Sequence, residues 1–141
     1  MTRKKAEAMD LEILAEIVSM SSIARPADRM GEAPAYAAEK ALDAAGLTLD
    51  DIAILEINEA FAAVPLISML KLSDKDKQKA KKLHAKANVN GSAIAIGHPN
   101  TASGARIMMN LMYELRRRGG GYALGAICGG LAQADACVIK V

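Results

Sequence analysis

The segment DIAILEINEAF, residues 51–61, decides the fold class of this chain. Its first part, residues 52–57, has the length and the apolar character of a strand that is buried on both faces. The strand leads directly into Asn58-Glu59-Ala60-Phe61, and residues 62–72 continue with the apolar spacing of a helix. We therefore expect an α/β domain, with Asn58 at the carboxyl end of a strand and at the start of a helix.

Upstream of this segment the sequence predicts one strand and one helix. Residues 11–23 are mostly apolar and predict a strand, although Glu12 and Glu16 lie four positions apart and leave a helix open. Residues 34–45 predict a helix, because a proline opens the segment and Gly46 follows its end.

Downstream, two helices precede two strands. We expect a lysine-rich helix capped by Ser73-Asp74, a helix from Thr101 or Ser103 to Arg118, and strands over residues 122–127 and 134–141 joined as a hairpin. The order of elements predicts a mostly parallel sheet covered by helices, with an antiparallel last strand.

Size and composition favour a single domain over residues 1–141, with disorder left open for residues 1–10. The chain has 141 residues and is 52% apolar, which is enough for one core and too little for two. One Phe, three Tyr and no Trp argue against a nucleic-acid reader that stacks bases on aromatic rings. No run of 18 apolar residues occurs, so we expect no membrane span.

The charged residues and cysteines are typical of a cytoplasmic protein. Seven of the 18 basic residues fall between Lys71 and Lys86, and we interpret them as a solvated helix face, with an anion-binding patch as the alternative. Cys128 and Cys137 are nine positions apart; reduced thiols are favoured over a short-loop disulfide.

Three short segments place an amide, an imidazole and a thiol after apolar stretches: Asn58-Glu59-Ala60-Phe61, Gly97-His98-Pro99 and Cys128-Gly129-Gly130. In an open α/β sheet, ligands bind beyond the carboxyl ends of the strands, so these groups could converge on one cleft. A thiol near a histidine can take a proton from carbon, and imidazole and amide donors can stabilise an enolate or an oxyanion.

Each group also has a purely structural interpretation. Asn58 could cap a helix, His98 could be a surface histidine, and Cys128 could be a small buried residue beside a tight turn. Glu59 is interpreted as a first-turn residue that is favoured by the helix dipole. No metal site is expected, because His84 and His98 lack the surrounding ligand spacing of zinc sites.

The same segments resemble the signatures of the thiolases. NVNGSAIAIGHPNTASGAR at residues 88–106 resembles one signature, EINEAFA at residues 56–62 a second, and ICGG at residues 127–130 a third. They occur in the family's order and at comparable spacing, and the resemblance extends over residues 25–141. It is to the C-terminal half of the thiolase subunit, and it implies a three-layer α/β/α domain with a five-stranded mixed sheet.

The resemblance also implies residue roles. His98 would activate a nucleophilic cysteine and help to bind the thioester oxygen, and Asn58 would hold a water that completes this oxyanion site. Cys128 would be the acid/base that takes or returns the α-proton of an acyl-CoA. The backbone N–H of Gly130 would help to bind the acyl-enzyme oxygen, and Gly97 would belong to the same substrate-binding set.

The sequence departs from the family pattern at several positions near these groups. Ser92 stands where the family usually has glycine, and Asn100-Thr101 replace Leu-Gly after the proline. Leu131 adds bulk after Gly130. These differences predict a tighter pocket or a changed loop near His98 and leave the role of Gly130 intact.

The acylated cysteine of the thiolases belongs to their N-terminal half, and neither cysteine here has its sequence context. We therefore expect a second polypeptide to supply the nucleophile, with acyl-CoA as substrate, no separate cofactor, and a hetero-oligomer or homodimer as the assembly. The first alternative is a non-catalytic thiolase-like scaffold or acyl-ligand-binding module. The second is an interaction domain that docks through the lysine-rich helix.

Overall fold

One mixed sheet of four strands, in the order β1-β4-β3-β2, forms the centre of the computed structural model, which describes residues 1–141. The strands are β1 (Glu16–Ala24), β2 (Ile52–Ile57), β3 (Tyr122–Cys128) and β4 (Gln133–Lys140). Strands β2 and β3 are parallel, and β4 runs antiparallel to both β3 and β1. The predicted antiparallel last strand and its hairpin with β3 are confirmed.

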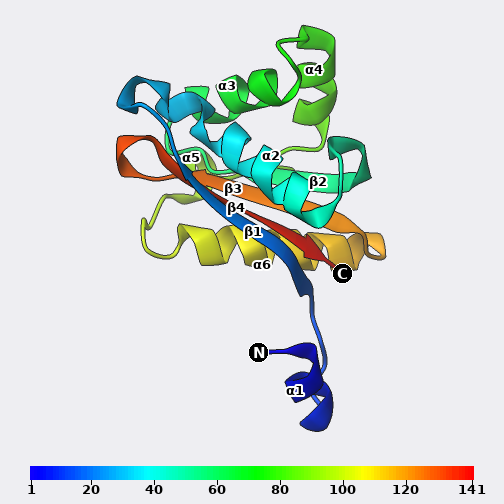
Figure 1. The fold of residues 1–141 in the computed structure, drawn as a ribbon. Coiled ribbons are helices and arrows are strands. Elements are labelled where there is room, and N and C mark those ends of the chain that lie inside the picture. The colour runs from blue at the N-terminus through cyan, green and yellow to red at the C-terminus, as the bar shows by residue number, and fades with distance from the viewer.

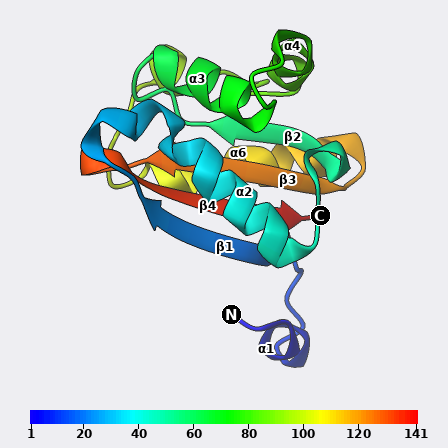
Figure 2. The same cartoon turned by 45° about the horizontal axis from the view of Figure 1, so that its top comes forward.

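Helices cover both faces of the sheet, which confirms the three-layer α/β/α arrangement (Figure 1). Helices α2 and α3 pack on one face and α6 packs on the other, while α1 lies apart from the sheet in both views (Figures 1 and 2). The helices are α1 (Arg3–Ala8), α2 (Ala33–Ala45), α3 (Ala63–Leu72), α4 (Lys77–Ala85), α5 (Ala93–Ile96) and α6 (Ser103–Arg118), with 3-10 turns η1 (Ala27–Glu32), η2 (Leu49–Asp51) and η3 (Gly130–Ala132).

The two faces of the sheet are covered unequally. A cluster of 19 buried residues lies on the side of α2 and α3, and a cluster of seven lies under α6. On the larger side, α2 fits closely against β1 because it presents alanines there and because Ser21 Oγ donates to Ala37 O at 2.6 Å. On the smaller side, α6 buries Ile107, Leu111 and Leu115, which lie four residues apart on one face.

The expected fifth strand is not confirmed. The segment after α4 makes a single parallel bridge, Leu55 to Ala87, at the outer edge of β2. Asn88 then turns away with φ of +50°, and its side chain completes the edge: Oδ1 accepts from Ile57 N at 2.9 Å and Nδ2 donates to Ile57 O at 3.0 Å. The amide therefore takes the hydrogen bonds that another strand residue would have made.

Several element boundaries differ from the sequence expectations. The strand predicted over residues 11–23 begins only at Glu16, and the predicted disorder-prone terminus contains α1. Helix α4 is capped by Asp76, not by Ser73-Asp74, because its Oδ1 accepts from Gln78 N at 2.8 Å and from Lys79 N at 3.1 Å. Only Leu83 of α4 is buried, so its lysines form a solvated face as expected.

No helix combines the length and apolarity that a membrane crossing needs. Both cysteines, Cys128 and Cys137, are free thiols.

Candidate active site

The predicted site residues meet at the end of the sheet where β2 and β3 finish. Here a cleft of about 460 Å³ is lined by the side chain or backbone of nine residues: Met30, Ala60, Phe61, His98, Asn100, Ile127, Cys128, Gly129 and Gly130. His98, Cys128 and Gly130 therefore share one cleft, although at least 30 residues separate the histidine from the other two in sequence. Asn58 stands behind the histidine, with its Nδ2 at 3.3 Å from His98 Nε2.

Asn58 is fully buried, and its position follows from the sheet. Its backbone N–H donates to Ala126 O at 3.0 Å, which extends the pairing of β2 with β3 by one residue. The interpretation of Asn58 as a helix cap is wrong, because α3 begins only at Ala63 and Asn58 makes no bond to its first turn. The side-chain amide instead contacts His98, which lines the cleft.

His98 lies in the exposed loop between α5 and α6. Gly97 precedes it with φ of +92°, a conformation that favours glycine, and Pro99 restricts the backbone after it. The ring is held at two points: Nδ1 lies 2.7 Å from Ser103 Oγ, at the start of α6, and Nε2 faces Asn58. Gly97 itself does not line the cleft; its backbone conformation sets the direction of the loop that carries His98.

Cys128 is the last residue of β3 and is 8% exposed. Burial raises the pKa of its thiol, with a smaller opposing contribution from a backbone hydrogen bond, so the thiol is neutral near pH 7. Cys137 is a core residue: it lies under α6, and burial raises its pKa to about 11. Only one of the two thiols therefore belongs to the cleft.

Gly130 opens the 3-10 turn η3, and a Cβ at this position would meet no atom within 4 Å. Its neighbours Leu131 and Ala132 have φ of +55° and +60°, which is uncommon for residues with a side chain. Leu131 is 82% exposed, so its bulk points away from the protein and leaves Gly130 open to the cleft.

Sequence patterns did not point to a buried polar network behind Asn58. Arg106, from α6, forms an ion pair with Glu56 of β2, and the two side chains are 15% and 4% exposed. Arg106 Nη2 also donates to Asn58 Oδ1 at 3.1 Å and to Ser92 Oγ at 3.3 Å. One feature of the sequence does indicate this network: Glu56 is the single charged residue in an apolar strand, and a buried carboxylate needs a partner.

Glu59 has a different place from the one that the sequence indicated. Because α3 begins four residues later, Glu59 is not in its first turn. Its carboxylate instead accepts from Ile94 N at 3.1 Å and from Asn88 Nδ2 at 3.4 Å. Glu59 thus ties the loop that carries His98 to the end of β2.

A second cavity, of about 640 Å³, lies near the start of β2 and is lined by Lys79, Lys82 and Lys86 among others. It contains none of the candidate site residues His98, Cys128 and Gly130. The structure brings together no group of three or more His, Cys, Asp or Glu side chains that could hold a metal ion.

Comparison with known proteins gives a consistent result. The sequence model of the family described as "Thiolase, C-terminal domain" matches residues 11–141. A probable acetyl-CoA acetyltransferase of Mycolicibacterium smegmatis is 46% identical over 140 residues, which is 99% of this chain and 34% of the relative. A 3-ketoacyl-CoA thiolase of Alcanivorax borkumensis is 42% identical over 142 residues, with the same two coverages.

Solved structures agree with the sequence comparisons. Human mitochondrial 3-ketoacyl-CoA thiolase superposes with a TM-score of 0.88 at 40% identity, over 99% of this chain and 33% of that one. A structure of the same human enzyme in complex with CoA gives the same TM-score and identity, with 98% of this chain covered. This chain spans about a third of the length of the relatives that it matches.

Proposed function

The chain belongs to the thiolase family, as its C-terminal domain, and from this premise we propose that it is the acid/base half of an acyl-CoA C-acyltransferase. It would make or cleave a carbon–carbon bond between acyl-CoA thioesters, with the nucleophilic cysteine supplied by another polypeptide. The observation that carries the proposal is the shared cleft, in which His98, Cys128 and Gly130 meet and which Asn58 supports from behind.

The proposed reaction has two steps. A thiolate of the partner polypeptide first attacks the carbonyl carbon of an acyl-CoA, so that a thioester forms on the partner and coenzyme A leaves. Coenzyme A takes the proton of the Cys128 thiol as it leaves, and the resulting Cys128 thiolate then takes a proton from the α-carbon of a second acyl-CoA. The resulting carbanion attacks the partner's thioester, and the partner's sulfur leaves as the new carbon–carbon bond forms.

His98, Gly130 and Asn58 also have roles in this proposal. His98 accepts the proton of the partner's thiol and then helps to bind the thioester oxygen, together with a water on Asn58. The N–H of Gly130 binds the oxygen of the acyl-enzyme. Cleavage is the reverse of this sequence, and the neutral thiol of Cys128 is then the proton donor, which agrees with the raised pKa of that thiol.

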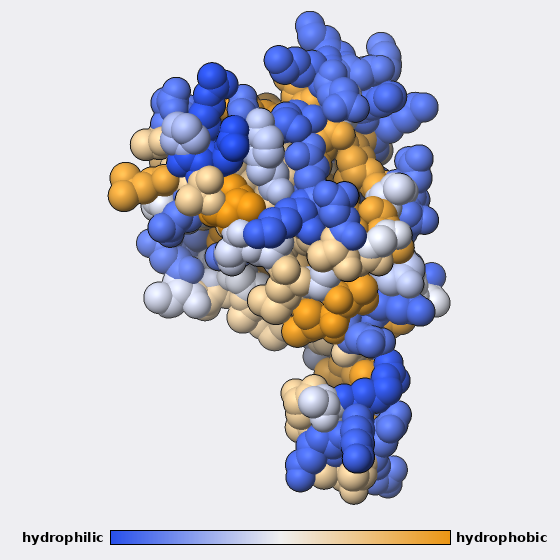
Figure 3. Space-filling view, viewed as in Figure 1, coloured by the Kyte–Doolittle hydropathy of each residue, from blue (hydrophilic) through white to orange (hydrophobic).

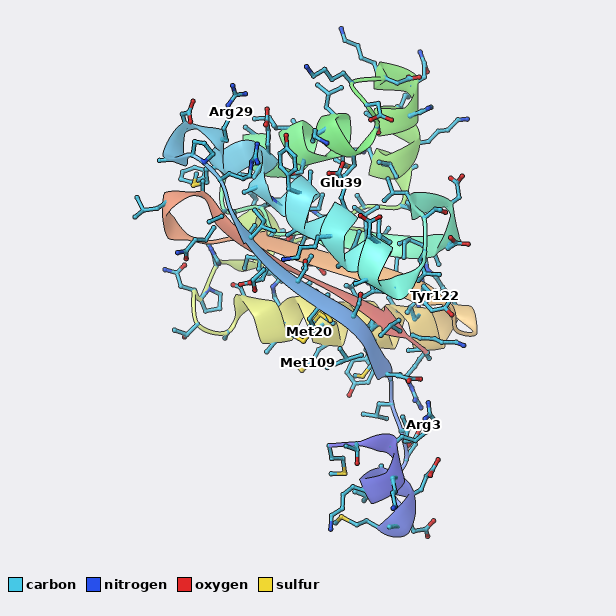
Figure 4. The ribbon with its side chains drawn as sticks, in the orientation of Figure 1. Arg3, Met20, Arg29, Glu39, Met109 and Tyr122 are labelled. Carbon is cyan, nitrogen blue, oxygen red and sulfur yellow. The ribbon has the colours of Figure 1, made fainter.

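The proposed partner is supported by the thiols and by the surface. Cys137 lies in the core and Cys128 is assigned to proton transfer, so neither is placed to carry the acyl group. On the face covered only by α6, Met20 of β1 and Met109 of α6 are 70% and 52% exposed, and both are labelled in Figure 4. Figure 3 shows the apolar surface over β1, which is the kind of surface that a stable partner covers.

A reconstitution experiment tests this function. The chain is mixed with a polypeptide that corresponds to the N-terminal two-thirds of its relatives, and CoA-dependent cleavage of a 3-oxoacyl-CoA is measured. Mass spectrometry of the mixture, treated with an acyl-CoA alone, detects acylation of the partner. We expect both reactions, and a hetero-oligomer by light scattering; a monomeric chain that never joins the partner would contradict the proposal.

Variants separate the proposed roles. Cys128→Ser should abolish cleavage and leave acylation of the partner, whereas His98→Ala should abolish both. Cys137→Ala is the matched control, because it removes the thiol outside the cleft and should keep both activities. Unchanged cleavage in Cys128→Ser would rule out the acid/base role.

The alternative is a non-catalytic thiolase-like scaffold or a module that binds an acyl ligand. The raised pKa of Cys128 favours it, because a neutral thiol is not a base in the chain by itself. This alternative predicts binding of the partner or of an acyl-CoA without turnover, both unchanged in Cys128→Ser. Under either function the two free thiols suit a reducing compartment, and we propose the cytoplasm.

A further inference from the structure

The side chains of Asn58 and His98 can each be arranged in two ways, and the network around them selects one. An amide can exchange the positions of its oxygen and nitrogen, and a neutral imidazole can carry its proton on either nitrogen. Both choices follow from the partners, because each hydrogen bond needs one donor and one acceptor.

Arg106 fixes the first choice. Its guanidinium has donors only, so the atom of Asn58 that lies 3.1 Å from Nη2 must be the carbonyl oxygen. The amide nitrogen of Asn58 then faces His98 Nε2, at 3.3 Å, and donates to it. His98 Nε2 therefore carries the lone pair and Nδ1 carries the proton.

The other side of the ring agrees with this tautomer. The Nδ1–H donates to Ser103 Oγ at 2.7 Å, and the hydroxyl of Ser103 donates in turn to Pro99 O at 3.2 Å. The opposite tautomer would place the N–H groups of Asn58 and His98 against each other. Rotation of the Asn58 amide would instead place its N–H groups against the N–H groups of Arg106. Asn58 is fully buried, and unpaired donors are costly there.

Arg106 is itself held by buried partners. Its ion pair with Glu56 joins α6 to β2, and Ser92 Oγ accepts from Arg106 while it donates to Glu56 Oε1 at 3.2 Å. None of these three side chains lines the cleft. They are therefore placed to act on the site through Asn58.

We propose that the Glu56–Arg106 ion pair is the positioning element of this site: it fixes the amide of Asn58 and thereby holds His98 in the Nδ1–H tautomer. In this tautomer Nε2 is the nitrogen that can accept a proton. The use of its lone pair to activate a thiol rests on the proposed function, whereas the tautomer does not.

The tautomer is measured by long-range proton–nitrogen NMR on the ¹⁵N-labelled chain alone, at a pH at which the rings are neutral. His84 is the only other histidine, is exposed, and has no hydrogen bond to its ring, so it serves as an internal reference. We expect His98 to show one tautomer, with the proton on Nδ1. A proton on Nε2 would overturn the proposal.

Two variants test the ion pair as the cause. The double variant Glu56→Gln, Arg106→Met removes the donor without leaving a buried charge unpaired. We expect His98 to change to a mixture of both tautomers, because the Ser103 hydroxyl can rotate and donate to Nδ1 instead of accepting from it. Asn58→Ala removes only the connecting amide, leaves the ion pair in place, and should also release the ring. If the double variant does not fold, Asn58→Ala decides the question; an unchanged tautomer in a folded variant would refute the inference.

The matched control is the double variant Glu12→Gln, Arg116→Met, which makes the same changes in an exposed ion pair that also involves α6. This control should leave the tautomer of His98 unchanged. If His98 showed a mixture of tautomers in the control as well, any disturbance of α6 would have this effect, and the proposal would be overturned. Because the measurement needs no partner and no substrate, a failed reconstitution would count against the proposed function alone.

Discussion

Leu131 is an apolar residue in a backbone conformation that disfavours it. Its φ is +55°, in the left-handed region that costs a residue with a Cβ about 1–2 kcal/mol, and its side chain is 82% exposed. We expect Leu131→Gly to raise the free energy of unfolding by about 0.5–1 kcal/mol, after the added chain entropy of glycine is subtracted. Urea denaturation followed by circular dichroism measures the change.

Leu131→Ala separates the effect of the backbone conformation on stability from the effect of the exposed side chain. Alanine keeps the Cβ and loses only exposed apolar atoms, so its free energy of unfolding should stay within about 0.5 kcal/mol of that of the parent. Equal stabilisation by alanine and glycine would mean that the exposed side chain, and not the backbone conformation, is the source of the effect.

Individual residues were predicted from sequence where their neighbours in the chain determine them. Gly97 and Pro99 set the direction of His98 locally, so the segment singled out the imidazole but left a surface histidine as the alternative. Asn58 was placed correctly after a strand but was given a helix-capping alternative, because the distance to the start of α3 depends on the turn between them. Arg106 was missed because its partners lie 48 and 50 residues away.

At the scale of elements, the packing of α6 on β3 depends on the absence of a side chain at Gly125. A Cβ there would lie 2.9 Å from Ile107 Cγ2 and 3.2 Å from Leu111 Cδ1. We expect Gly125→Ala to lower the free energy of unfolding by about 1–3 kcal/mol, because the helix must move away from the strand. Denaturation in urea gives this value.

Gly104→Ala is the control for this prediction. Gly104 lies in the first turn of α6, and a Cβ at this position meets no atom within 4 Å. Alanine should therefore leave the packing intact and stabilise the helix by up to about 1 kcal/mol. A loss of stability in Gly104→Ala comparable to that in Gly125→Ala would contradict the packing explanation.

Elements with a strong periodic pattern were predicted well, and the edge of the sheet was not. The apolar runs at residues 52–57 and 122–127 gave two parallel strands, and the Pro34 and Gly46 boundaries gave α2. The apolar patterns predicted four strands, and the fifth, which only the resemblance implied, is not confirmed. A side chain, the amide of Asn88, replaces the backbone after one bridge, and a resemblance of motifs carries no information on such a substitution.

For the whole molecule, Glu114 makes stability depend on pH in the acid range. Its side chain is 4% exposed, and hydrogen bonds from Arg117 and then Arg118, with a smaller one from Asn90, lower its pKa from 4.5 to about 2. The unfolded chain therefore binds a proton before the folded chain does, so stability is lost as the pH falls from about 4.5 to about 2.

We expect Glu114→Gln to flatten the dependence of Tm on pH across this range, because glutamine does not titrate. Thermal denaturation at a series of pH values measures the slope. Glu7→Gln, in the exposed part of α1 and outside every ion pair, should keep the slope of the parent chain. An identical slope in parent and Glu114→Gln would assign the acid sensitivity to other groups.

The amide of Asn88 also has a consequence for how copies of the chain can aggregate. It pairs with Ile57, the backbone of Lys86 and Asn88 pairs with Leu55, and the ammonium of Lys86 donates to Ile52 O, so most of the outer edge of β2 is covered. Only β1, at the other side of the sheet, has an edge that can accept a further strand. Two copies joined along β1 leave no free edge, so growth by strand addition ends at a pair and cannot continue into a fibre.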